Sequence, residues 1–370
     1  MKKFLARKVD TIFMMLGNSC NLNCVYCLQH PLVHHQIATN INPEIYDFIK
    51  QVSEENDGNI CRLHFYGGEP LVYYNQIKEI VKNTENIPNI RYTIVTNGKL
   101  LTDDKVEFFN KYDFQVAISW DGKNVLKTRH FDAFDPKKPL RRRIMRLNKL
   151  TITGVLSSEV YPLDLISSIQ EVMDEYYNLN KKVCWFNLDE VFDTGFEENC
   201  RYIIDDIDLD RVYKEMTELT EYFIDTFANN KIAKDHDLKI MYIRSIVQRI
   251  GYYINHTDEI LNKVLCRCTN GYKVLNLDLN GNLYSCHNTS DAVANINDEY
   301  VYYLSKILQL DNTKTRMRTR CKDCPVVGCC NGGCKLVTDE VLDQTYCDFK
   351  KAMYIPVLEG LRKYGALLNG

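Results

Sequence analysis

Three cysteines near the start of the chain limit most strongly what this protein can be. Cys20, Cys24 and Cys27 lie in the run Ser-Cys-Asn-Leu-Asn-Cys-Val-Tyr-Cys, with the spacing C-x3-C-x2-C. Iron–sulfur clusters of the four-iron type normally take four cysteine thiolates, so three cysteines leave one iron with an open position. A zinc site prefers cysteine pairs that add up to four ligands, and no fourth ligand lies nearby. A disulfide framework is typical of short secreted chains. The spacing therefore favours an iron–sulfur cluster.

The composition of the chain narrows the kind of protein further. Its 370 residues suggest about two domains, and 45% hydrophobic residues are enough for a sizeable core. The formal net charge of −3 gives no indication of a nucleic-acid or membrane partner, and no apolar run approaches the roughly 18 residues that a membrane span requires. Fifteen cysteines are many for a soluble protein of this size, and cysteines kept as metal thiolates imply a reducing compartment. We therefore expect a cytoplasmic enzyme.

Short apolar runs alternate with helical patterns from residue 11 to about residue 190. The expected strands cover residues 11–16, 62–66, 91–96, 114–119, 150–156 and 183–188. The expected helices between them cover residues 43–55, 72–83, 102–111, 140–148 and 163–178, and two more follow near 210–229 and 236–250. This alternation predicts an α/β fold with a parallel sheet. In βα barrels the site lies at the carboxyl ends of the strands, and the three cysteines follow the first strand.

Glycine and polar residues stand at the ends of three expected strands. The second strand ends in Gly67-Gly68-Glu69-Pro70, where glycine allows the backbone to approach a ligand closely. The third ends in Thr96-Asn97-Gly98 and the fourth in Ser119-Trp120-Asp121-Gly122. Asn-Gly and Asp-Gly are also ordinary turn signals. At successive strand ends, however, they favour a ligand site.

Together these motifs resemble those of the radical S-adenosylmethionine (SAM) enzymes. The resemblance implies a partial (β/α)6 TIM-like barrel, in which Cys20, Cys24 and Cys27 hold a 4Fe-4S cluster that chelates SAM. Electron transfer to SAM then releases a 5'-deoxyadenosyl radical, so the hard chemistry belongs to the cofactor. The residues that it predicts around SAM are Tyr26, Gly67, Gly68, Glu69, Thr96, Asn97, Ser119, Asp121, Val155 and Leu188. The last two are adenine candidates, although apolar strand residues usually belong to the core.

A second set of cysteines occupies the C-terminal part. It reads Cys268-x12-Gly281-x4-Cys286, then Cys321-x2-Cys324-x5-Cys330-x3-Cys334, and finally Cys347. This order resembles the SPASM pattern of radical SAM enzymes that modify peptides. The resemblance implies a small cysteine-rich SPASM domain with two auxiliary 4Fe-4S clusters, three clusters in all.

The family pattern divides these cysteines between the two auxiliary clusters. Cys268, Cys286 and Cys334 would hold the first cluster, with Cys266 as the nearest candidate for its fourth ligand. Cys321, Cys324, Cys330 and Cys347 would hold the second, and Cys329 could exchange with Cys330. The alternative is a zinc site made by Cys321, Cys324, Cys330 and Cys334. The expected domains are a radical SAM barrel over residues 1–230, a helical connector over 231–265, and the SPASM domain with a C-terminal helix over 266–370.

The resemblance implies a radical SAM oxidoreductase that matures a ribosomally made peptide by forming a crosslink, through a thioether, carbon–carbon or other carbon–heteroatom bond. Its expected partners are the peptide or protein substrate and ferredoxin or flavodoxin as electron donor. Many such enzymes begin with a leader-binding domain of roughly 80 residues. With Cys20 so early in the sequence we expect no such domain here, so a separate leader-binding protein, the barrel mouth, or the connector and C-terminal surfaces would capture the peptide.

Three other functions stay open. One is oxidation of cysteine or serine to formylglycine, as in anaerobic sulfatase maturases, which this chain resembles in layout. Those enzymes carry an aspartate directly after the cysteine that matches Cys286, and here the residue is His287. A histidine could accept a proton near neutral pH, or it could simply form a hydrogen bond near the cluster. The remaining two are a small-molecule radical SAM dehydrogenase and a non-catalytic iron–sulfur electron-transfer protein.

Overall fold

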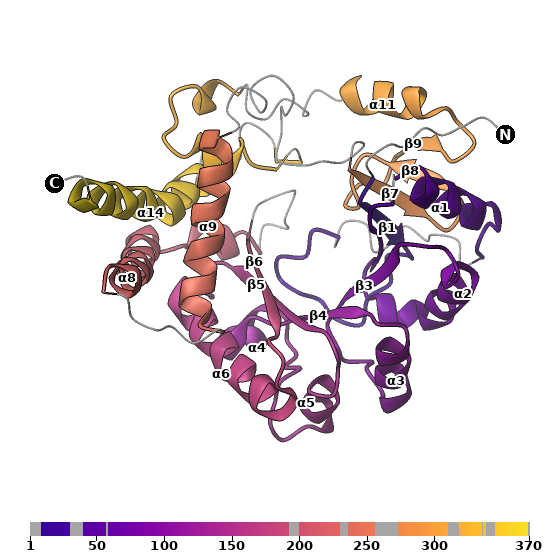
Figure 1. Cartoon of the computed structure of the whole chain (residues 1–370), viewed down its shortest axis with the longest axis horizontal. Coiled ribbons are helices and arrows are strands. Elements are labelled where there is room, and N and C mark those ends of the chain that lie inside the picture. Colours follow the sequence, from indigo (N-terminus) through magenta and orange to yellow (C-terminus); the bar gives the residue numbers. More distant parts are fainter. Residues whose placement is uncertain are drawn as a thin grey trace.

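A single curved sheet of nine strands organises the protein (Figure 1). The computed structural model describes residues 9–29, 40–56, 58–191, 200–229, 236–255, 273–309, 318–334, 336–337 and 345–368. The strands are β1 (Thr11–Met15), β2 (Cys61–Tyr66), β3 (Ile90–Thr96), β4 (Gln115–Ser119), β5 (Leu150–Leu156), β6 (Trp185–Glu190), β7 (Val274–Asp278), β8 (Asn282–Tyr284) and β9 (Ala292–Asn295). Their order is β6-β5-β4-β3-β2-β1-β7-β8-β9, and all pairs from β6 to β7 are parallel. The predicted α/β fold with a parallel sheet is confirmed.

Helices cover the outer face of this sheet (Figure 1). They include α1 (Glu44–Glu54), α2 (Tyr74–Thr84), α3 (Asp103–Lys111), α5 (Pro139–Ile144) and α6 (Pro162–Asn180). In α2, the buried residues Ile77, Ile80, Val81 and Thr84 recur at steps of three and four, which places them on one face of the helix. This apolar face packs against the sheet.

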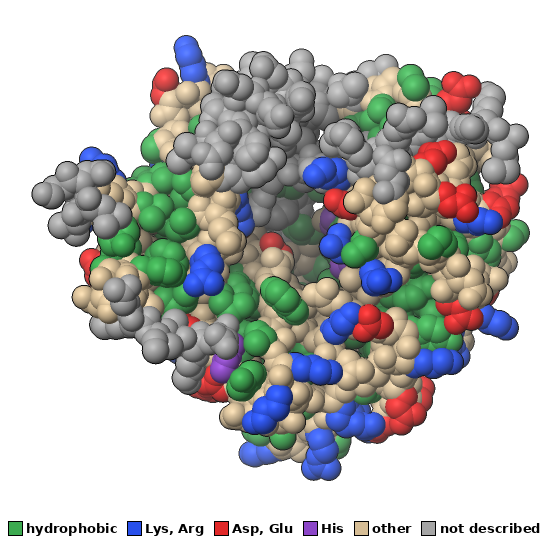
Figure 2. Space-filling view, viewed as in Figure 1, with side chains coloured by type: hydrophobic (Ala, Val, Ile, Leu, Met, Phe, Trp, Pro, Cys, Tyr) green, Lys and Arg blue, Asp and Glu red, His purple; other side chains and the backbone are tan. Residues whose placement is uncertain are grey.

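The two faces of the sheet differ in chemistry. Along β2, Cys61, Leu63 and Phe65 are fully buried, and His64 and Tyr66 point to the opposite, inner face because side chains alternate along a strand. The strand register sets polar residues beside one another on that inner face. They include the pair His64 and Thr93 and the row Ser119, Thr153 and Asn187. Complete TIM barrels fill their interior with bulky branched side chains. Here the polar inner face borders a hollow at the centre of the molecule (Figure 2).

The C-terminal part of the chain continues the same sheet. Strand β7 lies parallel to β1, with Thr11 opposite Val274 and Met15 opposite Asp278. The hairpin expected at Asn280-Gly281 joins β7 to β8, and Gly281 has a positive φ of 87°. A turn of this kind requires such a φ, which glycine adopts without strain. The strands of the expected SPASM region, β7, β8 and β9, therefore belong to the same sheet as the barrel strands.

The remaining helices lie beside the barrel and in the C-terminal part. They are α4 (Val125–Thr128), α7 (Tyr202–Asp205), α8 (Leu209–Ala228), α9 (Leu238–Asn255), α11 (Tyr300–Gln309), α12 (Val327–Cys330) and α14 (Cys347–Leu368), with short 3-10 turns η2 (Pro70–Tyr73), η3 (Gly122–Asn124) and η6 (Thr319–Cys321). The C-terminal helix α14 packs against α8 (Figure 1). Within the described ranges, no helix has the length and hydropathy of a bilayer-spanning segment.

Candidate functional site

The loop after β1 carries Cys20, Cys24 and Cys27 across the centre of the curved sheet (Figure 1). Backbone hydrogen bonds fix its first part to the end of β2, where Gly68 N donates to Gly17 O and Glu69 N donates to Ser19 O, both over 2.9 Å. A Cβ atom at Gly67 would lie 2.4 Å from the carbonyl oxygen of Gly17, and one at Gly68 would lie 2.5 Å from that of Asn18. The close approach that these glycines permit is thus between the cysteine loop and the β2 end.

The second part of the loop is fixed to the end of β4. The backbone N–H of Val25 donates to Thr128 O over 3.0 Å, and the hydroxyl of Tyr26 donates to Asp121. Burial raises the pKa of Tyr26 well above its usual value, so this phenol stays a donor. The predicted pair Tyr26 and Asp121 is therefore in direct contact.

Asp121 is the centre of a buried network. Its carboxylate accepts hydrogen bonds from Thr128 Oγ1 at 2.6 Å, Arg129 Nε at 3.0 Å and Val155 N at 2.9 Å, in addition to Tyr26. Asp121 is 1% exposed and Arg129 is 9% exposed. Because its oxygens accept hydrogen bonds from these protein donors, Asp121 holds the cysteine loop and the ends of β4 and β5 together in this structure. Its predicted contact with SAM stays a prediction.

The cysteine thiols lie in a partly buried, electrostatically asymmetric setting. Burial raises the pKa of Cys24 to about 12, and the guanidinium of Arg129 opposes this rise. Burial likewise raises the pKa of Cys20. A thiol must lose its proton to bind a metal. Arg129 thus supplies a cation beside the thiolate that would form at Cys24.

Three predicted SAM residues meet at the ends of β2 and β3. The carboxylate of Glu69 accepts hydrogen bonds from Thr96 Oγ1 at 2.6 Å and from the backbone N–H groups of Asn97 at 2.8 Å and Leu71 at 2.9 Å. Burial raises the pKa of Glu69, while the hydrogen bond from Thr96 acts in the opposite direction. These bonds hold the strand ends together at one point.

Asn21 connects this point to the cysteine loop. Its Oδ1 accepts a hydrogen bond from Asn97 Nδ2 over 2.8 Å. Its own Nδ2 is buried, and no acceptor among the described residues pairs with it. A buried donor without a partner is costly, so it calls for an acceptor from outside the chain. The carboxylate that SAM carries is an acceptor of this kind, and the site therefore fits the cofactor.

The remaining predicted SAM residues divide between the two faces of the sheet. Ser119 pairs with Thr153, and Val155 lies two residues further along β5 on the same inner face. Leu188 pairs with Gly154 and therefore points to the opposite, helix-covered face. The structure brings Ser119 and Val155 to the site, whereas it places Leu188 away from it.

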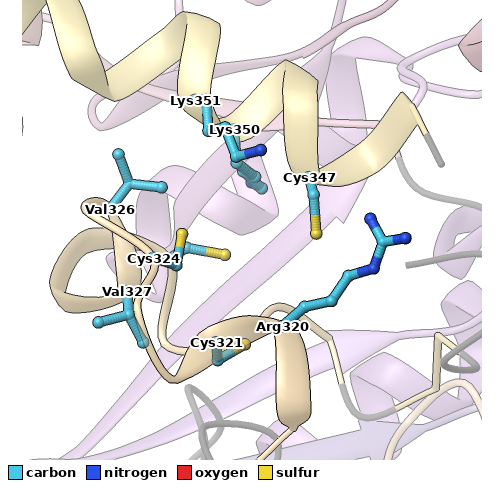
Figure 3. Close-up of a pocket in the computed structure, with 10 residues that line it drawn as sticks. Arg320, Cys321, Cys324, Val326, Val327, Cys347, Lys350 and Lys351 are labelled. Atoms are coloured by element: carbon cyan, nitrogen blue, oxygen red, sulfur yellow. The ribbon is translucent and has the colours of Figure 1, made fainter. Parts of the chain in front are cut away.

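A second site is a cavity of about 210 Å³ in the C-terminal part (Figure 3). Its lining contains Cys321 from the end of η6, Cys324 from the loop after it, Cys330 from α12 and Cys347 from the start of α14. These are the four cysteines expected to hold the second auxiliary cluster. Among the described lining residues, neither Cys329 nor Cys334 occurs. The cluster set and the alternative zinc set, which includes Cys334, both stay predictions.

The structure describes only two of the cysteines expected to hold the first auxiliary cluster. Cys266 and Cys268 lie outside the described residues. Cys286 follows β8 and is buried, and Cys334 is partly buried. The prediction for this cluster stays open.

His287 lies between the barrel and the cysteine loop. Its ring stacks on Phe13 with centroids 4.4 Å apart and meets Tyr66 edge-on at 4.5 Å. Its backbone carbonyl accepts a hydrogen bond from Gln29 Nε2 at 3.2 Å. The ionisable neighbours of Tyr66 include Cys27 and Cys286. The inner face of β1 and β2 thus meets both cysteine systems.

Sequence reasoning missed two residues of this site. Arg129 stands in a stretch without any motif, and no spacing marks it as the cation beside Cys24. Asn21 directly follows the first cysteine of the loop. A polar residue inside a ligand run was a signal that could have identified it.

Comparisons with known proteins agree with this geometry. Residues 14–155 match the Radical SAM superfamily. The chain is 23% identical over 393 residues to the radical SAM cyclopropyl synthase TigE of Paramaledivibacter caminithermalis, which covers 95% of this chain and 74% of that protein. It is 30% identical over 126 residues to a cysteine-type anaerobic sulfatase-maturating enzyme of Clostridium novyi, covering 31% of this chain and 33% of that protein.

Two solved structures share the fold. Native anSMEcpe with bound AdoMet has a TM-score of 0.62 at 20% identity, covering 96% of this chain and 99% of that one. Streptococcus suis SuiB bound to the precursor peptide SuiA has a TM-score of 0.58 at 17% identity, covering 89% of this chain and 72% of that one. At these identities the likeness shows the fold alone.

Proposed function

We propose that this protein, a radical SAM enzyme whose radical SAM domain covers residues 14–155, oxidatively matures a peptide. The observation that carries the proposal is that Gln29, two residues after Cys27, donates a hydrogen bond at 3.2 Å to the carbonyl of His287, which directly follows Cys286 and whose ring lies 4.5 Å from that of Tyr66. A substrate in the hollow beside this residue would lie between a radical source and an electron acceptor. Peptide oxidation requires both.

Cys20, Cys24 and Cys27 would hold the first cluster, and Asn21, Glu69 and Asn97 would face SAM. When bound, the cluster and SAM supply a 5'-deoxyadenosyl radical that takes a hydrogen atom from the substrate. The chain's own contribution is to hold this loop rigidly, through Gly68 and Glu69 at one end and Val25 and Tyr26 at the other. Rigid positioning of the reacting groups lowers the barrier without further binding energy.

The bond that forms is inferred from the chemistry of oxidation and from one relative. The substrate loses one hydrogen atom and then one electron and one proton, so the product lacks two hydrogens. Crosslinks through sulfur or carbon have this balance, and so does closure of a cyclopropane ring. The relative that spans 95% of this chain is named a cyclopropyl synthase. We therefore propose formation of a new bond within one peptide as the first candidate reaction.

The partners follow from the same proposal. Solved neighbours hold peptides, namely SuiA in SuiB and the Cp18Cys peptide in anSMEcpe. We infer a ribosomally made peptide as the substrate here, delivered by a separate leader-binding protein, with ferredoxin or flavodoxin as electron donor in the cytoplasm. The two auxiliary clusters would bring the number of 4Fe-4S clusters to three.

Formylglycine formation is the second candidate, because a sulfatase-maturating enzyme is among the relatives and anSMEcpe shares the fold. Against it stands His287 at the place where those enzymes carry an aspartate. The ring of His287 is held by Phe13 and Tyr66. Its role as a proton acceptor stays a prediction.

The test is the mass of the peptide encoded beside the gene, after anaerobic co-expression with the enzyme. We expect a loss of two hydrogens, with fragmentation locating the new bond. The Cys24→Ala variant should leave the mass unchanged. Replacement of the sulfur of one cysteine by oxygen, or a loss of two hydrogens that fragmentation places on a single serine without a crosslink, would instead indicate formylglycine. An unchanged peptide in the presence of active enzyme, measured as 5'-deoxyadenosine formation, would contradict the proposal.

A further inference from the structure

A buried lysine lies in the wall of the cavity that the four cysteines line. Lys350, on α14 one turn after Cys347, is 2% exposed and lines the cavity together with Cys321, Cys324 and Cys330 (Figure 3). Lysine is almost never fully buried unless its charge is paired. Here Lys350 Nζ lies 2.9 Å from Glu190 Oε2. The cavity therefore has a fixed positive charge on one side.

The partner of this lysine belongs to the barrel. Glu190 is the last residue of β6 and is 9% exposed. Its Oε1 accepts a hydrogen bond from Tyr354 at 3.2 Å, and Arg249 in turn donates to the hydroxyl of Tyr354 at 3.2 Å. The preceding residue, Asp189, pairs with Val155 on the inner face of the sheet. The ion pair thus joins the cysteine cavity to the strand end beside the substrate hollow.

The two residues of the ion pair differ in their position relative to the cavity. Lys350 is among the residues that line the cavity, whereas Glu190 is not among the described lining residues. Of the two charged residues, Lys350 is the one that forms part of the described cavity wall. Two other cations line the cavity, but Arg320 is exposed and the side chain of Lys351 is 42% exposed and pairs with Asp348 at 2.9 Å. Solvent screens exposed charges, whereas the buried Lys350 is screened little.

A 4Fe-4S cluster held by four thiolates carries net negative charge, and reduction by one electron makes it more negative. Cluster potentials depend on net charge and burial, and charges interact strongly away from water. A buried ammonium in the wall favours the reduced cluster, and a buried carboxylate favours the oxidised one. We propose that Lys350 sets the reduction potential of the auxiliary cluster at Cys321, Cys324, Cys330 and Cys347, with Glu190 as the opposing charge. The inference that the accepted electron comes from the substrate rests on the proposed function.

The experiment is a redox titration, followed by electron paramagnetic resonance, of the full chain reconstituted with iron and sulfide without oxygen. The relevant potential is the one that disappears in Cys321→Ala. We expect Lys350→Met to lower it so that the oxidised-to-reduced ratio at a given potential rises about tenfold, which equals about 59 mV for one electron. Glu190→Gln should shift it in the opposite direction.

Two further variants separate charge from fold. Lys350→Arg keeps the charge and should keep the potential. The double variant Lys350→Met with Glu190→Gln removes both charges, and its potential should lie between those of the two single variants. Lys351→Met removes the partly exposed cation near Cys324 and Cys347, and solvent screening should make its shift smaller than that of Lys350→Met.

Equal-sign shifts in the two single variants, or no shift in either, would overturn the proposal. The titration requires no peptide, so it can fail or succeed independently of the peptide mass. An unmodified peptide together with opposite shifts would contradict the proposed function and leave the role of Lys350 in place. A modified peptide with an unmoved potential would contradict the role of Lys350 alone.

Discussion

Arg129 lies over the ring of Tyr26, with its guanidinium carbon 5.3 Å from the ring centre, and its Nε lies 3.0 Å from the Asp121 carboxylate that Tyr26 also contacts. The three side chains are buried. They connect the end of β4 to the loop that carries Cys24 and Cys27. This network explains how the loop keeps its shape at the centre of the sheet.

Replacing one member of this buried ion pair should destabilise the protein strongly. Arg129→Gln or Asp121→Asn leaves the other charge buried and unpaired, which costs about 3–5 kcal/mol. The double variant should cost less than the sum of the two single variants, because no uncompensated charge remains. Denaturant unfolding of the apo protein measures all three free energies.

An exposed ion pair supplies the control for this experiment. Lys149 pairs with Asp113, and their side chains are 46% and 59% exposed. Lys149→Gln should cost less than about 1 kcal/mol. Equal losses in Lys149→Gln and Arg129→Gln would show that the network does not hold the loop.

Most of the barrel could be predicted from the sequence because its signals are local. The strand expected at residues 62–66 is β2 (Cys61–Tyr66), in whose sequence buried residues alternate with more exposed ones. The place of β7 beside β1 could not be predicted, because strand pairing between distant segments leaves no spacing signal. Arg129 was missed for the same reason, since only the fold brings it to Cys24.

Leu188 shows how a local signal was overlooked. In β6, Phe186 and Leu188 share one face, and Asn187 and Asp189 share the other with the exposed Trp185. Polar positions belong to the inner face in the neighbouring strands, so this alternation already indicated the helix-covered face for Leu188. The adenine contact of Leu188 stays a prediction.

The choice between Cys329 and Cys330 can be tested by iron content. Both cysteines are buried, but among the described residues only Cys330 lines the cavity with Cys321, Cys324 and Cys347. Cys330→Ala should therefore lose the second auxiliary cluster, about four iron atoms per chain. Cys329→Ala should retain them.

Iron and sulfide assays after anaerobic reconstitution measure this difference. A zinc site would retain zinc and show no change in iron for either variant. Loss of iron in Cys329→Ala alone would reverse the assignment.

Asn21→Asp should weaken the binding of SAM. The substitution keeps the Oδ1 acceptor that Asn97 uses and removes the buried amide donor that has no partner among the described residues. The loss of one buried hydrogen bond costs about 1–3 kcal/mol, or roughly tenfold or more in the dissociation constant. Isothermal titration calorimetry of the reconstituted protein without oxygen measures it.

Asn23→Asp is the matched control, because it adds the same charge to the same loop on an exposed side chain. Its affinity for SAM should stay within about threefold of the wild type. If both variants weaken binding equally, the effect comes from the charge and not from the missing donor.

His64 should make the stability of the apo protein depend on pH. Burial lowers its pKa to about 4, and its Nδ1 lies 2.7 Å from Thr93 Oγ1. Between the ordinary histidine pKa of about 6.5 and this lowered value, the unfolded chain binds a proton that the folded chain excludes. Stability is therefore retained above about pH 6.5 and falls as the pH decreases toward about 4, by up to about 3 kcal/mol.

His64→Phe keeps an aromatic ring against Phe13, which lies 4.5 Å from the His64 ring, and removes the titrating nitrogens. The variant should flatten the decline in unfolding free energy over this pH range, as measured by urea denaturation at successive pH values. His130→Asn is the control, because His130 is exposed and has a positive φ of 59° that asparagine accepts. It should leave the decline unchanged. The predicted loss of stability at low pH arises because the folded protein excludes a proton from His64. An equal decline in His64→Phe and the wild type would therefore assign the pH dependence to other groups.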